Sequence, residues 1–506
     1  MRRLAFVYIF LAFMAIQSNL AFASFNKKSP NIVIILTDDQ DVDLDGLFPM
    51  NNVKHLIGEA GATFENAYTS SPLCCPSRSS LLSGKYAHNH HALNNSLSGG
   101  CNGPFWRSKI ELNQTMATLL SAVGYNTFFA GKYLNAYQGS TVPNGWHQFY
   151  GLHGNSRYYN YTLRENDRNF SYSDVYLTDL LKDKVLNFFN ARDKSSPFLA
   201  MIAPPAPHQP FTPADRHKGA FKGTTAKRTP SYNKPDREKH WLLAESKQIS
   251  PATLKLMDSF FQQRWESLLA VDELVAAVVE SLSNSGELDN TYIIYTSDNG
   301  YHLGQFAQPF DKRQPYETDI HIPLLIRGPS IKSGVKVTAP TLLIDILPTI
   351  MEWTNLPLDS LMDGQSFQPF LTNADGYDAS SDPLFRRGFL IQHFGEGNLQ
   401  TYKPECPMWQ PADRLAECTL EADCHCQDSW NNTYACVRNF AHRINHLYCE
   451  FHDNEDFIEF YDLDEDPHQL YNTGQQMLII ERALYSLALQ NLTQCQGASS
   501  CSIHIF

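Results

Sequence analysis

Long apolar segments are scarce in this chain of 506 residues. The most apolar run, from Leu4 to Ile16, is shorter than the about 20 residues that a membrane-spanning helix needs. Two arginines precede this run and Ala21-Phe22-Ala23 follows it, which is the pattern of a cleaved secretory signal. We therefore predict a signal peptide over residues 1–24, no membrane span, and a mature protein outside the cytosol.

Positive charge is also in short supply. The chain has 40 Lys and Arg against 53 Asp and Glu, which gives a formal net charge of −13. Because such a protein repels polyanions at long range, we expect no nucleic-acid partner. The repulsion weakens in an acidic compartment, where carboxylates begin to protonate and histidines become charged. The sequence leaves the oligomeric state open.

Internal repeats and low-complexity tracts are absent, which argues against a solenoid or a disordered chain. The length is sufficient for two domains. After the acidic stretch 375–382 the composition becomes Cys-rich, aromatic and less regular. We therefore predict a large domain over residues 25–382 and a smaller Cys-rich α+β domain over residues 383–506.

A paired C-x-x-C arrangement, which would indicate a zinc site, is missing as well. Eight of the 11 cysteines lie between Cys406 and Cys501. Cys418, Cys424, Cys426 and Cys436 could bind a metal, but the signal peptide favours disulfides. The spacing does not fix the connectivity, although Cys75 and Cys101 can pair.

Six N-x-S/T sequons predict glycosylation sites if the source is eukaryotic. They begin at Asn94, Asn113, Asn160, Asn169, Asn431 and Asn491.

A polar or charged group follows each of four apolar runs. The run Asn31–Thr37 has the continuous apolar pattern of a strand buried on both faces, and it ends in Asp38-Asp39. Three further runs are Thr127–Ala130 before Gly131-Lys132, Phe198–Ile202 before His208, and Thr291–Thr296 before Asp298-Asn299. Since the carboxyl ends of strands in α/β sheets open onto the ligand crevice, these groups predict a site.

Helical patterns alternate with the strands. Residues 173–190 have helical periodicity, and Ser250-Pro251 predicts the start of a long amphipathic helix that runs to about Ser283. Residues 342–356 carry another apolar helical pattern. This alternation of strands and helices predicts an α/β fold with a largely parallel sheet covered by helices.

The segment 215–240 is basic and has a local charge of +5. Its cations are Arg216, Lys218, Lys222, Lys227, Arg228, Lys234, Arg237 and Lys239. Such a segment is usually a solvated surface loop. Its position after His208 also allows it to border the pocket and attract an anionic ligand.

The stretch from Cys74 to Gly84, CCPSRSSLLSG, resembles the sulfatase signature C-x-P-S-R-x-x-x-L-T/S-G. Ser83 stands where Thr is commoner and keeps the hydroxyl. The resemblance implies that a formylglycine-generating enzyme oxidises Cys74 to formylglycine (3-oxoalanine). One hydroxyl of the hydrated aldehyde would attack sulfur, and the other would later expel the sulfate. Arg78 would remain beside it as a fixed cation.

The same resemblance extends along the large domain. It implies an alkaline-phosphatase-like sulfatase fold with a large, mostly parallel mixed sheet between helices. The implied metal ligands are Asp38, Asp39, the modified Cys74, Asp298 and Asn299, whose hard oxygens suit one Ca²⁺ ion, or Mg²⁺, rather than zinc. The implied catalytic residues are Cys74, Arg78, Lys132, His208 and Lys312, of which the last three would hold sulfate oxygens or protonate the leaving alcohol.

One departure from the family pattern concerns the base that expels sulfate. Many members read G-K-x-H, whereas this chain reads GKYLN and places Asn135 near that position. His302, His88 and His90 are the alternative candidates for the base.

At finer grain, segments such as Gly84–His90, Phe129–Asn135 and Thr296–His302 are similar to family members that act on N-acetylglucosamine 6-sulfate. The resemblance implies removal of the 6-sulfate from terminal residues of heparan and keratan sulfate, in a lysosomal or secreted enzyme. Two alternatives are an extracellular heparan 6-O-endosulfatase and a silent homologue that binds glycosaminoglycan. The endosulfatases carry a long basic insertion and typically Asp-His-Gly, where this chain has Asp298-Asn299-Gly300.

Overall fold

The computed structural model describes residues 29–372, 386–397, 416–419, 422, 425–441, 444–453 and 455–502. The predicted signal peptide, the predicted domain boundary at 375–382, and Cys406 and Cys424 lie outside the described residues.

A ten-stranded sheet forms the centre of the large domain. Its order is β11 (Val335–Val337), β2 (Ala62–Phe64), β10 (Leu324–Arg327), β9 (Thr291–Ser297), β1 (Asn31–Thr37), β8 (Phe198–Ala203), β4 (Asn126–Lys132), β5 (Gln148–Leu152), β6 (Tyr161–Glu165) and β7 (Arg168–Tyr172). The five strands from β9 to β5 are parallel, and antiparallel pairs flank them. The predicted mostly parallel sheet is therefore confirmed.

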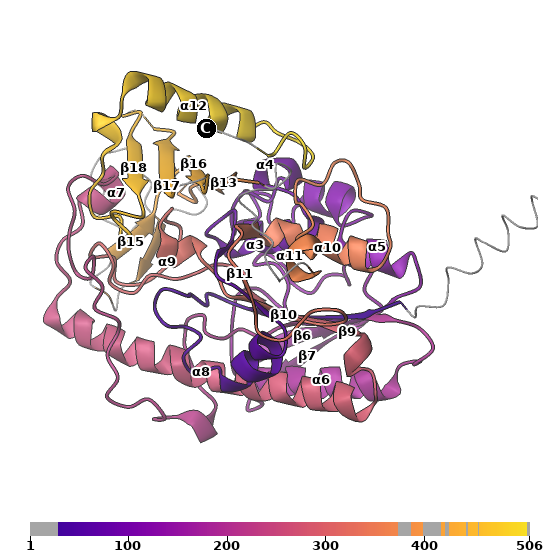
Figure 1. Cartoon of the computed structure of the whole chain (residues 1–506). Coiled ribbons are helices and arrows are strands. Elements are labelled where there is room, and N and C mark those ends of the chain that lie inside the picture. The colour runs from indigo at the N-terminus through magenta and orange to yellow at the C-terminus, as the bar shows by residue number, and fades with distance from the viewer. Residues whose placement is uncertain are drawn as a thin grey trace, which may run out of the picture.

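Helices cover both faces of this sheet (Figure 1). Val33 and Ile35 of β1 pack in one core cluster with residues of α6 (Leu177–Ala191) and α8 (Pro251–Asn284). Ile32 and Ile34 belong to the opposite cluster, with α3 (Cys74–Ser83), α5 (Met116–Ser121) and α10 (Ile346–Trp353). Because neighbouring side chains on a strand face opposite ways, burial on both faces explains the unbroken apolar run.

The predicted helices are present, with shifted ends. α8 spans Pro251–Asn284, and the side chain of Ser250 accepts a hydrogen bond from the Thr253 amide as its N-cap. α6 begins at Leu177, because the chain before it forms β7 and then bends up to the extended residue Tyr176. The apolar stretch 342–356 divides into the end of β12 (Thr341–Leu342), a short turn and α10.

The Cys-rich part of the chain builds a separate antiparallel sheet. Its order is β13 (Gly388–His393), β16 (Tyr434–Asn439), β17 (His446–Phe451) and β18 (Ile458–Asp462), and α12 (Ile479–Leu492) packs on it. Within the described residues the structure forms the disulfides Cys75–Cys101, Cys436–Cys449 and Cys495–Cys501, and Cys426 is also disulfide-bonded. The alternative of a zinc site at Cys426 and Cys436 is therefore wrong.

The remaining short helices and strands lie in the connections. They are α2 (Asn51–Val53), β3 (Ala67–Tyr68), α4 (Ala87–His90), α7 (Trp241–Ala244), α9 (Glu317–Ile320), α11 (Gln368–Thr372), β14 (Ala416–Thr419) and β15 (His425–Asp428). Among the described residues, no helix combines the length and the apolar character that a membrane crossing requires.

Ion pairs with carboxylates neutralise most of the cations in the basic segment 215–240. Arg216 contacts Asp179 and Glu273, and similar ion pairs hold Lys218, Lys227, Arg228 and Arg237. Lys239 instead inserts into the smaller domain, where its ammonium group donates to the Tyr461 hydroxyl and the Gln469 carbonyl. The segment therefore joins elements of the fold, as a structural loop does.

The predicted glycosylation sites differ in accessibility. Asn113, Asn160, Asn169 and Asn491 are exposed and Asn431 is partly exposed, whereas Asn94 is only 6% exposed. The Asn94 side-chain oxygen accepts hydrogen bonds from the Ser96 amide and hydroxyl, and a Cβ atom at Gly99 would lie 1.8 Å from it.

We expect Asn94 to carry no glycan in the folded protein, because a glycan on its buried amide would displace the Ser96 turn. Site-resolved mass spectrometry of protein secreted from a eukaryotic cell measures the occupancy, and Asn491, which is exposed in the same chain, is the internal control. High occupancy at Asn94 in folded protein would contradict the packing around this side chain.

Candidate functional site

The carboxyl ends of four parallel strands bring the predicted site residues together. Asp38 and Asp39 follow β1, and Asp298 and Asn299 follow the neighbouring β9, whose Ser297 pairs in register with Thr37. Lys132 is the last residue of β4, and His208 lies in the loop after β8. The sheet topology therefore places these groups at one edge, as the sequence predicts.

Cations from distant parts of the chain hold the first carboxylate pair. The Lys132 ammonium donates to both oxygens of Asp38, at 3.0 and 2.8 Å. The Lys312 ammonium donates to Asp39 Oδ2 at 2.8 Å, and His208 Nε2 lies 3.7 Å from the same atom. Burial would raise the pKa of Asp38, but Lys132, His208 and Arg78 together lower it well below its usual value. Both acids are therefore held as carboxylates.

Cys74 is the first residue of α3 and lies against this pair. Its Sγ atom is 3.6 Å from Asp38 Oδ1 and 3.9 Å from Asp39 Oδ1. Burial raises the pKa of the Cys74 thiol to about 12, although the two lysines oppose the shift. Since a nucleophilic cysteine requires a lowered pKa, the unmodified side chain is suited to remain a neutral thiol.

Arg78 lies one turn after Cys74 in α3 and contacts both Asp298 and the backbone of Lys132. Its Nε atom donates to Asp298 Oδ2 at 2.7 Å, and Nη1 donates to the Lys132 carbonyl at 2.6 Å. Burial raises the pKa of Asp298, with Arg78 acting in the opposite direction. Arg78 is therefore a buried cation that contacts two other predicted site residues, Asp298 and Lys132.

The oxygen donors of this cluster fit a hard cation. Asp38, Asp39, Cys74 and His208 each place one ligand atom within 4.8 Å of the others. Asn299 donates to Asp39 Oδ1 and is fully buried, yet its own Oδ1 atom has no hydrogen-bond partner among the described residues. A buried oxygen without a partner is costly, and a bound cation would satisfy it.

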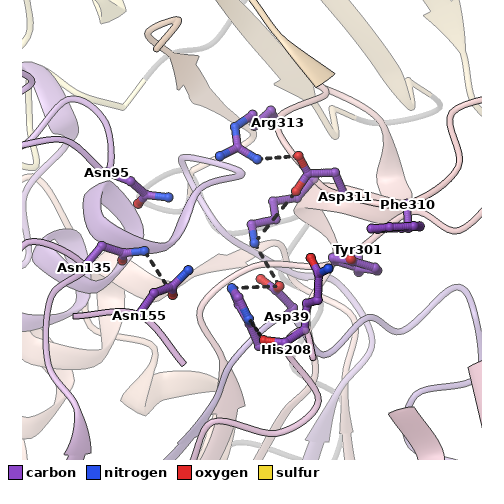
Figure 2. A pocket seen from close by; sticks show the side chains of 11 residues that line it. Asp39, Asn95, Asn135, Asn155, His208, Tyr301, Phe310, Asp311 and Arg313 are labelled. Carbon is purple, nitrogen blue, oxygen red and sulfur yellow. Dashed lines mark hydrogen bonds and ion pairs between the residues drawn. The ribbon is translucent and has the colours of Figure 1, made fainter. Parts of the chain in front are cut away.

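A cavity of about 290 Å³ opens above the cluster (Figure 2). It is lined by Asp39, Asn95, Asn135, Asn155, His208, Gln209, Tyr301, Phe310, Asp311, Lys312 and Arg313. Three of the predicted residues, Asp39, His208 and Lys312, therefore face the cavity. The remaining predicted residues do not line the cavity and are buried: Cys74, Arg78, Lys132, Asp38, Asp298 and Asn299.

Two kinds of wall enclose the cavity. Figure 2 shows Asn95, Asn135 and Asn155 on one side, where Asn135 Nδ2 lies 3.4 Å from Asn155 Oδ1. Asp311 and Arg313 stand opposite and form an ion pair. The cavity therefore offers amide, carboxylate and guanidinium groups to a polar ligand.

The smaller domain supports the second wall. Arg313 donates to Glu396 Oε2 from Nε at 3.1 Å and from Nη2 at 2.6 Å, and its carbonyl accepts from the Tyr434 hydroxyl. Glu396 also accepts from the Asn95 amide and thereby links the two sides of the cavity. The smaller domain therefore supports both walls of the cavity without lining it.

The histidines considered as alternative bases do not line the cavity. Both ring nitrogens of His90 are engaged by Ser80 and the Ala92 amide, and those of His88 by Gln392 and Cys495. His302 is buried between Asp319 and Gln427. His208 is the histidine that lines the cavity within the described part of the chain, and Asn135 lines it as well.

Sequence reasoning missed most of the cavity wall. Asn95, Asn155, Gln209, Tyr301, Phe310, Asp311 and Arg313 follow no periodic pattern. Asp311 and Arg313 flank the predicted Lys312, and that adjacency was the one available signal. None of the basic residues of segment 215–240 lines the cavity, so its predicted role at the pocket border is not supported.

Comparison with known proteins gives a consistent result. The family model described as Sulfatase matches residues 30–356. An N-acetylglucosamine-6-sulfatase from Capra hircus is 43% identical over 496 residues, which cover 96% of this chain and 87% of that protein. An extracellular sulfatase SULF-1 homologue from Drosophila melanogaster is 40% identical over 380 residues, but these cover only 34% of that protein.

A solved structure of a protein in complex with its substrate, D-glucosamine-2-N,6-O-disulfate, has a similar fold. The TM-score is 0.74 at 23% identity, and the match covers 92% of this chain and 97% of that chain. This likeness concerns the fold, and the expected alkaline-phosphatase-like architecture is confirmed.

Proposed function

This chain belongs to the sulfatase family, and we propose that it hydrolyses the 6-sulfate of terminal N-acetylglucosamine 6-sulfate in heparan and keratan sulfate. The observation that carries the proposal is the placement of buried Cys74 against Asp38 and Asp39, the two carboxylates held by Lys132 and Lys312, directly behind the polar cavity that Asp39 lines. The similarity to the goat N-acetylglucosamine-6-sulfatase over almost the whole chain supports the choice of sugar.

Asp38, Asp39, Asp298 and Asn299 would hold one Ca²⁺ ion. The buried carboxylates of Asp38 and Asp39, which belong to a cluster able to hold a metal ion, and the unpartnered Asn299 Oδ1 atom support this assignment. When bound, the ion supplies a positive charge that polarises the sulfate group. Lys132 and Lys312 help to lower the pKa of Asp38 and Asp39. Both side chains are therefore ionised, as metal binding requires.

Cys74 would be converted to formylglycine by a formylglycine-generating enzyme during secretion. The modification supplies a hydrated aldehyde as a renewable nucleophile. The helix that begins at Cys74 is buried throughout and fixes the side chain beside Asp38 and Asp39. Arg78 lies one turn further along the same helix, where Asp298 holds its guanidinium.

Lys312 and His208 would act on the substrate directly, because both line the cavity. His208 Nδ1 lies 2.5 Å from the Gln209 carbonyl, which orients the ring and directs Nε2 toward Asp39. These two side chains are therefore placed to hold a sulfate oxygen or to give a proton to the leaving sugar oxygen. Lys132 is fully buried and acts by fixing Asp38.

The cavity suits a single sugar ring at a chain end. Its volume of about 290 Å³ is at the lower end of the usual range for small-ligand sites, about 300 to 1,000 Å³. Asparagine, aspartate and arginine side chains on its walls match the hydroxyl and acetamido groups of the sugar. A lysosomal or secreted location fits such a substrate, since the repulsion of sulfated glycans by a net charge of −13 weakens in acid.

Removing one charge from the metal ligands should weaken calcium binding. We expect Asp298→Asn to bind Ca²⁺ at least about tenfold more weakly than the wild type, because it loses a carboxylate in a site built from few ligands. Calorimetric titration of metal-depleted protein measures the affinity. Asp345→Asn is the matched control, since Asp345 is also buried and paired with an arginine, Arg386, outside the cavity. Equal affinities in Asp298→Asn and wild type would remove Asp298 from the metal site.

The enzyme should release sulfate faster from terminal than from internal glucosamine 6-sulfate. The comparison uses oligosaccharides of defined sequence that carry one 6-sulfate, either at the non-reducing end or inside the chain. Equal rates on both substrates would favour endo action.

Cys74→Ala, which removes the precursor of the nucleophile, should release no sulfate while keeping the melting temperature of the wild type. Sulfate release by Cys74→Ala would contradict the proposed nucleophile.

A further inference from the structure

Asp39 has a backbone conformation that residues other than glycine rarely adopt. Its φ is 68°, in the left-handed region, where the Cβ atom crowds the following carbonyl. In an extended strand two consecutive side chains would point to opposite faces. The left-handed turn after β1 instead lets Asp38 and Asp39 both approach Cys74 Sγ. The site therefore depends on a conformation that the surroundings must maintain.

Arg264 contacts this turn from the middle of α8. The side chain is buried, and its Nη2 atom donates to the Asp39 carbonyl at 2.9 Å and to Asp41 Oδ2 at 2.6 Å. On the other side of the same residue, the Asp39 amide donates to Asp298 Oδ1 at 3.0 Å. Both peptide groups of the strained residue are thus fixed by side chains that are distant in sequence.

The same guanidinium also reaches the wall of the cavity. It lies 4.2 Å from the centre of the Tyr301 ring, and Tyr301 lines the cavity next to Lys312. Planar stacking on an aromatic face is a property of the arginine guanidinium that the lysine ammonium does not share. Arg264 itself does not line the cavity, so it can affect a ligand only through Asp39 and Tyr301.

We propose that Arg264 is a positioning residue, which holds the strained Asp39 in the orientation that binds the metal and connects this metal ligand to Tyr301 in the substrate cavity. This role rests on the proposed calcium-dependent function. The competing explanation is that Arg264 only neutralises the buried Asp41, whose other oxygen accepts from the Leu44 amide. The two explanations predict different calcium affinities.

The test uses the full-length secreted protein with three changes. Arg264→Met removes every contact of the guanidinium and keeps the aliphatic stem. The double variant Arg264→Met/Asp41→Asn also removes the buried carboxylate that would otherwise lose its partner. Arg386→Met is the matched control, because Arg386 is equally buried and likewise contacts one carboxylate, Asp345, and one backbone carbonyl, of Asp363, away from the cavity.

Calorimetric titration with Ca²⁺ gives the dissociation constant of each metal-depleted protein, and near-ultraviolet circular dichroism establishes that each is folded. We expect both Arg264 variants to bind Ca²⁺ about tenfold to 100-fold more weakly, as is typical when a group that orients a ligand is removed. Arg386→Met should bind like the wild type. Raising the calcium concentration should restore most of the lost kcat in the Arg264 variants, because all metal ligands remain.

A folded double variant with the calcium affinity of the wild type would overturn the positioning role and leave the proposed function intact. Equal weakening in Arg386→Met would also overturn it, since the effect would then be general destabilisation. A wild-type protein that binds no calcium would overturn the metal centre of the proposed function, and the role of Arg264 with it.

Discussion

The burial of three carboxylates beside one another is the constraint on which the rest of the site depends. Asp38, Asp39 and Asp298 are fully buried, and carboxylates this close raise one another's pKa unless positive charge compensates them. Lys132 and Arg78 supply that compensation from β4 and α3. The parallel sheet makes this arrangement attainable, because its strands deliver residues far apart in sequence to one edge.

The smaller domain supports the same site mainly through its contacts with Arg313 of the large domain. Arg313 adopts a left-handed conformation with φ of 90°, and Glu396 and Tyr434 of the smaller domain hold its side chain and its carbonyl. Lys312, the neighbouring residue, reaches back to Asp39. The loop that carries both cations is therefore fixed from two sides, and the cavity wall depends on the docking of the smaller domain against the large one.

The residues of the buried cluster were predictable from the sequence, and the cavity wall was not. Asp38, Lys132 and Asp298 follow strands whose continuous apolar runs reveal burial on both faces. Glu396 lies 83 positions from Arg313, and no periodicity indicates that they meet. Arg264 lies in a helix whose sequence pattern is amphipathic, and that pattern does not predict its buried contact with Asp39. The contact results from the packing of α8. His302 was a candidate base because it follows a site motif, yet its ring is held by Asp319.

The central claim is that Cys74 acts after oxidation to formylglycine. The most direct test is mass spectrometry of the proteolytic peptide that ends at Arg78, from protein secreted by a cell that contains the formylglycine-generating enzyme. We expect formylglycine at position 74, with Cys75 recovered as a disulfide-derived cysteine because it pairs with Cys101. An unmodified Cys74, in a preparation where a control sulfatase is modified, would contradict the claim and point to a glycosaminoglycan-binding protein without sulfatase activity.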